Sequence, residues 1–283
     1  HDLCPHVTFK MPEYVVMPNS KEEISSIVKL LNKNKIPYVV RGNGASSHGL
    51  VFSEGAILDL NRMKTMEFDE KNWLVKVGPG IAAFDLQREA RKRGFRVHTA
   101  EPAALVCANI MTSGLLSTFS TTYGVSADNF IDAEFIARDG STFRLNDITA
   151  PNLFAFHNAN AEHEPFAICV SVSMKLHPVT DDEEGILVPF ESLEKALNFA
   201  KDCATRHIGL AIGVLGEEFI SSFLAPTKKR ADEVRDIFTQ KLGMPYLVLL
   251  IGDRYALRSV REMGYPVIDK KLFEGLTPID AKQ

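Results

Sequence analysis

The chain lacks a long apolar run and lacks any excess of positive charge. Its most hydrophobic stretch is residues 246–251, which is typical of a buried strand. A helix that crosses a bilayer needs about 20 apolar residues. The formal net charge is −4 over 283 residues, which provides no basic surface for nucleic acid. The sequence therefore predicts neither a membrane span nor a nucleic-acid partner.

Cysteines are also scarce, and no two of them lie close together in the sequence. They are Cys4, Cys107, Cys169 and Cys203, so no C-x-x-C pair is available for zinc or an iron–sulfur cluster, and we expect no metal site. We also expect no secretory signal peptide. Isolated cysteines in such a chain are usually buried thiols, which favours a reducing, cytoplasmic compartment.

Length and composition predict two domains. A chain of 283 residues with 45% apolar content is long enough for about two hydrophobic cores. The charged residues 180–185 are typical of a domain boundary. We therefore expect a first domain over residues 1–179 and a second, incomplete one over residues 180–283. The chain begins at His1 rather than Met, which predicts either cleavage or a piece of a longer protein.

A glycine-rich segment follows a predicted apolar strand over residues 36–40. Glycine tolerates positive φ and carries no Cβ, so backbone N–H groups of such a segment can turn inward and form an anion-binding concavity suited to a pyrophosphate. The alternative is a surface turn before the next predicted strand, residues 55–60. The segment comprises Arg41, Gly42, Asn43, Gly44, Ala45, Ser46, Ser47, His48 and Gly49.

The spacing of this segment matches neither G-x-G-x-x-G nor G-x-x-x-x-G-K-[ST]. It resembles instead the pyrophosphate loop R-G-x-G-[TA]-S-x-x-G of the vanillyl-alcohol oxidase or PCMH-type family of FAD-binding oxidoreductases. The resemblance implies an α+β fold with a two-subdomain PCMH-type FAD-binding domain, and FAD as the cofactor. The pattern is filled by Arg41, Gly42, Gly44, Ala45, Ser46 and Gly49.

The segments before and after the loop resemble the same family. Residues 12–24 look like its opening strand and helix, and Ser20 with Glu23 forms a predicted capping box for that helix. Residues 74–80 resemble the strand and glycine turn that precede its second helix, expected over residues 82–93. These matches follow one another in the order of the family.

Later segments imply further cofactor contacts. Residues 109–114 resemble the segment N-I-x-T-x-[GA] that runs beside the flavin, and residues 123–140 resemble a Y-G…D…x-x-D-G run. Residues 166–178 resemble the strand that ends the FAD domain. Outside the glycine-rich segment, the implied FAD-binding residues are Pro102, Asn109, Thr112, Ser113, Gly114, Tyr123, Gly124 and Ile168.

Two departures from the family pattern concern the chemistry. Relatives that bind FAD covalently through this loop carry histidine where this chain has Ala45, so we expect non-covalent FAD. His48 either hydrogen-bonds a phosphate oxygen or is a solvated loop residue. Residues 161–168 replace the family's G-[ST]-E-G-[TS]-L-G-I, and Pro165 removes one N–H donor. The resemblance therefore supports FAD binding more strongly than turnover.

The second half of the chain alternates predicted strands and helices after the charged stretch. This alternation resembles the ferredoxin-like substrate (cap) domain of the family's 2-hydroxy-acid dehydrogenase branch. The H-x-G-D-G-N-x-H motif of that branch, which supplies its catalytic and metal-binding histidines, does not occur in the sequence, and the catalytic residues stay unassigned. We expect strands over residues 186–190, 211–215 and 246–251 and helices over residues 192–205, 228–242 and 253–263.

Two functions remain open at this point. The first is an FAD-dependent oxidoreductase, or its flavin-binding fragment, that oxidises a small 2-hydroxy acid such as D-lactate or glycolate. The flavin would accept the hydride, and electrons would leave through an acceptor domain or subunit outside this chain. The second is a non-catalytic flavin-binding or interaction module of a larger redox protein. Bleaching of bound flavin by hydroxy acids would separate the two.

Overall fold

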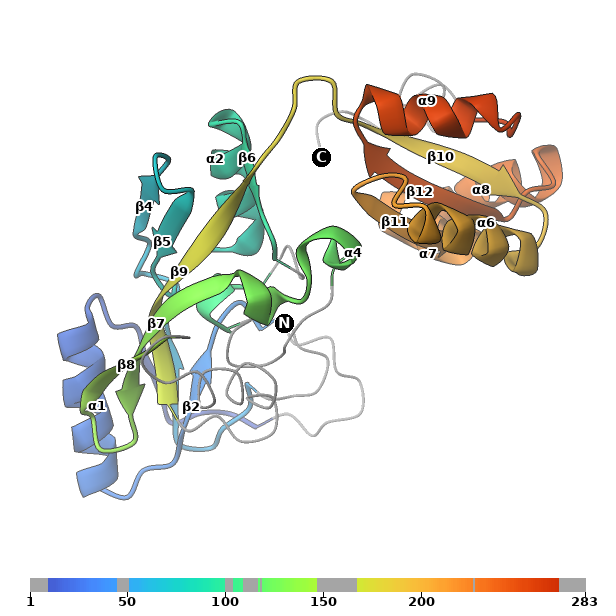
Figure 1. The fold of residues 1–283 in the computed structure, drawn as a ribbon. Helices are drawn as coiled ribbons and strands as arrows, with labels where there is room; N and C mark the ends of the chain where they lie inside the picture. Colours follow the sequence, from blue (N-terminus) through green and yellow to red (C-terminus); the bar gives the residue numbers. More distant parts are fainter. Residues whose placement is uncertain are drawn as a thin grey trace. The chain divides into compact units, whose positions relative to one another are not determined.

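The computed structural model describes residues 10–44, 51–99, 104–108, 117, 119–146, 167–225 and 227–269 (Figure 1). The chain separates into two compact units. The first comprises His1–Ser117 and Tyr123–Val179, and the second comprises Thr118–Thr122 and Thr180–Gln283. The change of unit after Val179 falls directly before the charged residues 180–185. No helix in the described ranges is long and apolar enough to span a bilayer.

The first unit begins with a small parallel sheet. Strands β1 (Tyr14–Val16), β3 (Ala56–Asp59) and β2 (Tyr38–Arg41) lie in that order, and helix α1 (Lys21–Lys33) joins β1 to β2. The apolar face of α1 packs in one cluster with the buried side chains of β3 and with Ile168. This packing brings the end of β2, where the glycine-rich segment begins, against a fixed core.

Helix α1 begins where the sequence predicts. The Glu23 backbone N–H donates to the Ser20 Oγ (3.2 Å), which satisfies one of the unpaired N–H groups at the start of a helix. The Glu23 carboxylate accepts from the N–H of Asn19 (2.7 Å). A capping box would use the N–H of Ser20, so the reciprocal bond reaches one residue further back.

A larger antiparallel sheet completes the first unit. Its central strand is β9 (Ala167–Pro178), which pairs with β5 and β7 and, at its end, with β6. Buried apolar side chains of these strands and of helix α2 form the core, which includes the thiols of Cys107 and Cys169. The other elements of this unit are β4 (Met66–Asp69), β5 (Leu74–Val77), α2 (Ala83–Lys92), β6 (Phe95–Val97), η1 (Ser126–Asn129), β7 (Phe130–Ala137) and β8 (Thr142–Asn146). Helix α4 (Ser120–Tyr123) falls in the second unit except for its last residue, Tyr123.

The second unit is built on a three-stranded antiparallel sheet in the order β10-β12-β11. The predicted strand over residues 246–251 is its central strand, β12. Leu187 of β10 also pairs with Ile268 through two backbone hydrogen bonds of 2.9 and 2.8 Å, so a later segment lies along the other edge of β10. The elements are β10 (Glu184–Phe190), α6 (Leu193–Thr205), β11 (Ala211–Gly216), α7 (Glu217–Leu224), α8 (Lys228–Asp236), η2 (Ile237–Lys241), β12 (Tyr246–Gly252) and α9 (Arg254–Glu262).

Two details of the second unit differ from the sequence expectations. The predicted helix over residues 228–242 changes after Asp236 into a π-helical turn, η2, which buries Phe238. Helix α7 was not predicted, because it follows β11 directly, and Gly216 at its N-cap makes no side-chain hydrogen bond that would mark a helix start.

Candidate cofactor site

The first half of the glycine-rich segment is held by Asp59, at the end of the neighbouring strand. Arg41 Nη1 donates to Asp59 Oδ2 (2.6 Å), and the backbone N–H and Nδ2 of Asn61 both donate to Asp59 Oδ1 (3.0 and 2.8 Å). Asn61 Nδ2 also donates to the carbonyl of Gly42 (3.2 Å). The loop therefore leaves β2 from a fixed position, and the supporting residues Asp59 and Asn61 were not among the predicted site residues.

The two glycines of this half occupy positions that other residues would disturb. Gly44 is buried with φ +68°, in the left-handed region that favours glycine, and a Cβ there would lie 3.4 Å from the Arg41 guanidinium. At Gly42, a Cβ would lie 3.2 Å from the Cβ of Ala108. Asn43, between them, is exposed. Glycine at both positions lets the backbone lie close to Ala108 and Arg41, in a conformation that a larger residue would strain.

The remaining predicted contacts lie partly outside the described residues. Tyr123, Gly124 and Ile168 lie within the described ranges. The others lie outside: Ala45, Ser46, Ser47, His48, Gly49, Pro102, Asn109, Thr112, Ser113 and Gly114.

The Tyr123–Gly124 turn is fixed by Asp128 and Asn129, the two residues directly before strand β7. Gly124 has φ +76°, and Asp128 Oδ2 accepts from the N–H of Val125 (2.9 Å). The side chain of Asn129 is 1% exposed, and its Nδ2 donates to the carbonyls of Tyr123 (2.9 Å) and Val125 (3.0 Å). The buried side-chain amide of Asn129 thus binds the carbonyl groups on both sides of Gly124.

Tyr123 also belongs to a cluster with two histidines. Its ring stacks on His177 of β9 with centroids 3.9 Å apart, and it meets His98 edge to face at 6.4 Å. His177 Nε2 lies 2.6 Å from Asn129 Oδ1. Burial lowers the pKa of His177 to about 4, aided by the neighbouring His98, Lys175 and Arg96. The ring is therefore neutral at physiological pH.

His98, at the end of β6, is the second histidine of this cluster. It is 0% exposed, and its Nδ1 lies 3.3 Å from the Ser117 hydroxyl. Its Nε2 is buried and makes no hydrogen bond within the described ranges. Burial lowers the pKa of His98, which the carboxylate of Asp128 opposes in part. Sequence reasoning did not select His98, since no motif marks it.

Ile168 lies near the start of β9 with its side chain 6% exposed in the core. It pairs with Ile136 of β7 on one side. On the other side, the register of β5 with β9 ends at Val172, so no described strand pairs with residues 167–171 along that edge. A contact of the Ile168 main chain with the cofactor stays a prediction.

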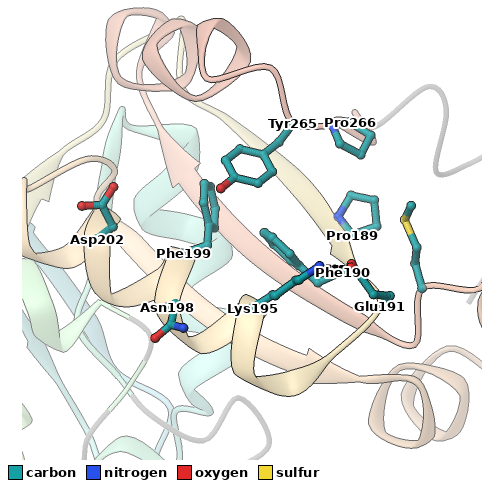
Figure 2. A pocket seen from close by; sticks show the side chains of 10 residues that line it. Pro189, Phe190, Glu191, Lys195, Asn198, Phe199, Asp202, Tyr265 and Pro266 are labelled. Atoms are coloured by element: carbon teal, nitrogen blue, oxygen red, sulfur yellow. Dashed lines mark hydrogen bonds and ion pairs between the residues drawn. The ribbon is translucent and has the colours of Figure 1, made fainter.

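A groove of about 510 Å³ lies in the second unit, and none of the residues that line it is a predicted FAD-binding residue (Figure 2). Its aromatic side chains are Phe190, Phe199 and Tyr265, with ring centroids 4.8 to 5.5 Å apart. Glu191 and Lys195 form an ion pair at the rim. The lone His207 is exposed after the end of α6. In the ranges that the structure describes, no three His, Cys, Asp or Glu side chains gather as metal ligands would.

Comparison with known proteins identifies the first unit. A family described as "FAD binding domain" matches residues 12–146. D-lactate dehydrogenase of Archaeoglobus fulgidus is 25% identical over 93% of this chain and 65% of its own length. Glycolate oxidase subunit GlcD of Bacillus subtilis is 24% identical over 71% of this chain and 44% of its own length. The chain thus spans less than two thirds of either relative.

Solved structures show the same fold. 6-Hydroxy-D-nicotine oxidase from Arthrobacter nicotinovorans matches with a TM-score of 0.69 at 17% identity, over 100% of this chain and 62% of the other. 4-Ethylphenol oxidase from Gulosibacter chungangensis matches with a TM-score of 0.72 at 20% identity, over 94% and 59%. Residues 12–146 match the FAD-binding domain family, and the resemblance to PCMH-type flavoproteins is confirmed. FAD is the cofactor of this domain.

Proposed function

We propose that the chain is an FAD-dependent oxidoreductase, or the flavin-binding part of one, which oxidises a small 2-hydroxy acid. The observation that carries the substrate class is the similarity to a D-lactate dehydrogenase over 93% of the chain, supported by the glycolate oxidase subunit. The electron acceptor would be a domain or subunit outside this chain, in the cytoplasm.

The residues of the first unit would bind and orient the cofactor. Backbone N–H groups from Gly42 to Gly49 would face the pyrophosphate, with the Arg41–Asp59 pair fixing where the loop begins. The Tyr123–Gly124 turn, held by Asn129, and the residues 109–114 would line the ribityl chain and flavin, with the Ile168 main chain at the pyrimidine edge. When bound, FAD supplies the hydride-accepting chemistry.

We further propose that the second unit is the substrate domain. The order Ile268-β10-β12-β11, with α6 between β10 and β11 and α9 after β12, agrees with a ferredoxin-like βαββαβ arrangement that has α7 and α8 inserted. Its groove, with aromatic floor and charged rim, is a second place where a small molecule would fit.

Purified protein tests the cofactor step. The chain should be yellow, and heat or acid precipitation should release all the flavin to the supernatant, because Ala45 replaces the histidine of the covalent relatives. Flavin that remains with the pellet would contradict non-covalent binding.

The substrate step is tested on the longest gene product that contains these residues. Anaerobic D-lactate or glycolate should bleach its flavin band. A yellow protein that dithionite bleaches, but that neither acid bleaches, would favour the non-catalytic flavin-binding module.

A further inference from the structure

The imidazole of His98 has one nitrogen that no residue in the described part of the chain pairs with. The side chain is 0% exposed, and Nδ1 lies 3.3 Å from the Ser117 hydroxyl, whereas Nε2 is buried and makes no hydrogen bond among the residues that the structure describes. Buried polar atoms in proteins are paired with very few exceptions, since leaving one unpaired costs free energy. An unpaired atom at this position therefore needs an explanation.

The surroundings of His98 point to the cofactor. Tyr123, whose turn is a predicted FAD contact, meets the His98 ring edge to face at 6.4 Å. Ser117, which contacts Nδ1, follows the predicted flavin segment 109–114 by three residues, and Pro102 follows His98 by four. One predicted cofactor residue, Tyr123, thus contacts this side chain, and two further predicted segments lie within a few residues of His98 or Ser117 in the sequence.

We propose that His98 is a further FAD-binding residue, whose Nε2–H donates to an oxygen of the bound cofactor. This inference rests on FAD binding by the first unit. In this proposal the Ser117 hydroxyl donates to Nδ1, so the single proton of the neutral imidazole is on Nε2. The polar atoms of FAD are mostly acceptors: phosphate oxygens, flavin carbonyls and ring nitrogens. A neutral donor is therefore the complementary group.

The two ring nitrogens can be tested separately by a matched pair of amides. In His98→Gln the side-chain amide reaches the position of Nε2, whereas in His98→Asn it reaches only the position of Nδ1 and can still contact Ser117. A role in FAD binding predicts near-normal affinity for the Gln variant and about tenfold weaker affinity for the Asn variant, the effect expected for one lost hydrogen bond. A purely structural role through Ser117 predicts the reverse order.

The experiment measures FAD affinity of the reconstituted chain by flavin fluorescence, together with the melting temperature of each variant without FAD. His98→Leu removes the unpaired atom, so its FAD-free melting temperature should equal or exceed that of the unaltered chain while FAD binds about tenfold more weakly. Equal FAD affinities in all variants, or a weakened affinity that only follows a lower FAD-free melting temperature, would overturn this proposal alone. Absence of FAD binding by the unaltered chain would overturn the proposed function as well.

Discussion

At the scale of single residues, Gly44 is the position where the backbone conformation limits which residue the loop can carry. Its φ of +68° lies in the left-handed region, and its missing Cβ would face the guanidinium of Arg41. β-Branched residues resist this conformation more than others do, because two substituents on Cβ crowd the backbone. We therefore expect the loop geometry and FAD binding to depend on the same residue.

We expect Gly44→Val to abolish FAD binding while the far-UV circular dichroism of the chain stays unchanged. Gly216→Val is the matched control, since a Cβ at Gly216 meets no atom within 4 Å and the residue has φ −90°. The measurement is the flavin that copurifies with each variant. A Gly44→Val protein that retains its flavin would show that the loop does not contact FAD.

His177 predicts how stability depends on pH. Its pKa in the folded chain is about 4, against an ordinary value of 6.5, mainly because of burial. Between these pH values the unfolded chain binds a proton at His177 that the folded chain does not bind. The neutral ring therefore stabilises the folded chain above pH 6.5, and this contribution is lost as the pH falls toward 4. Burial lowers the pKa of His98 as well, which acts in the same direction.

His177→Gln should flatten this dependence. Between pH 7 and pH 5, the variant should lose about 1 kcal/mol less of its free energy of unfolding than the unaltered chain does. This value is small because the His177 ring is partly exposed. Thermal or urea unfolding at the two pH values measures it. The exposed His207 gives the control His207→Gln, which should leave the pH dependence as it is. Parallel pH profiles for all three proteins would contradict the assigned burial of His177.

At the scale of elements, the ends of β2 and β3 are joined by one carboxylate. Asp59 is 7% exposed and accepts from Arg41 and twice from Asn61, so it fixes both strand ends and the exit of the loop. Removing one partner of a largely buried ion pair leaves the other charge without compensation.

We expect Asp59→Ala to lower the free energy of unfolding by about 2 kcal/mol, less than for a fully buried pair because Arg41 is partly exposed, and to weaken FAD binding as well. Asp85→Ala is the control: its pair with Arg88 has side chains 44% and 56% exposed and should contribute little. Chemical unfolding and flavin titration measure the two effects. Equal, small losses in both variants would show that Asp59 does not organise the loop.

At the scale of the whole molecule, the flavin of the 283-residue chain should be reduced by dithionite but not by D-lactate or glycolate within minutes. The sequence contains no histidine motif that would place a base beside the substrate, and loss of a general base typically costs about 100- to 10,000-fold in rate. Stopped-flow absorbance under anaerobic conditions measures the bleaching. Rapid bleaching by either acid would show that a base within these residues completes the active site.

The features predicted from sequence are those set by neighbouring residues. The caps Ser20 and Ser192 and the central strand β12 follow from short patterns, and the structure shows them close to their predicted positions. The support of the loop by Asp59 depends on two parallel strands lying side by side, which no local pattern reports. The aromatic and histidine cluster likewise joins residues that are distant in the sequence, such as His98 and His177.

One consequence of the buried amide of Asn129 concerns the position of a single proton. Its Nδ2 donates to two carbonyls, so its Oδ1 can only accept from His177, and the Nε2 of that ring must carry the hydrogen. His177 is therefore the tautomer that carries its hydrogen on Nε2 and none on Nδ1. In acid the second proton can enter only at Nδ1, so the Nε2 bond to Asn129 survives while the ring stacked on Tyr123 becomes a cation.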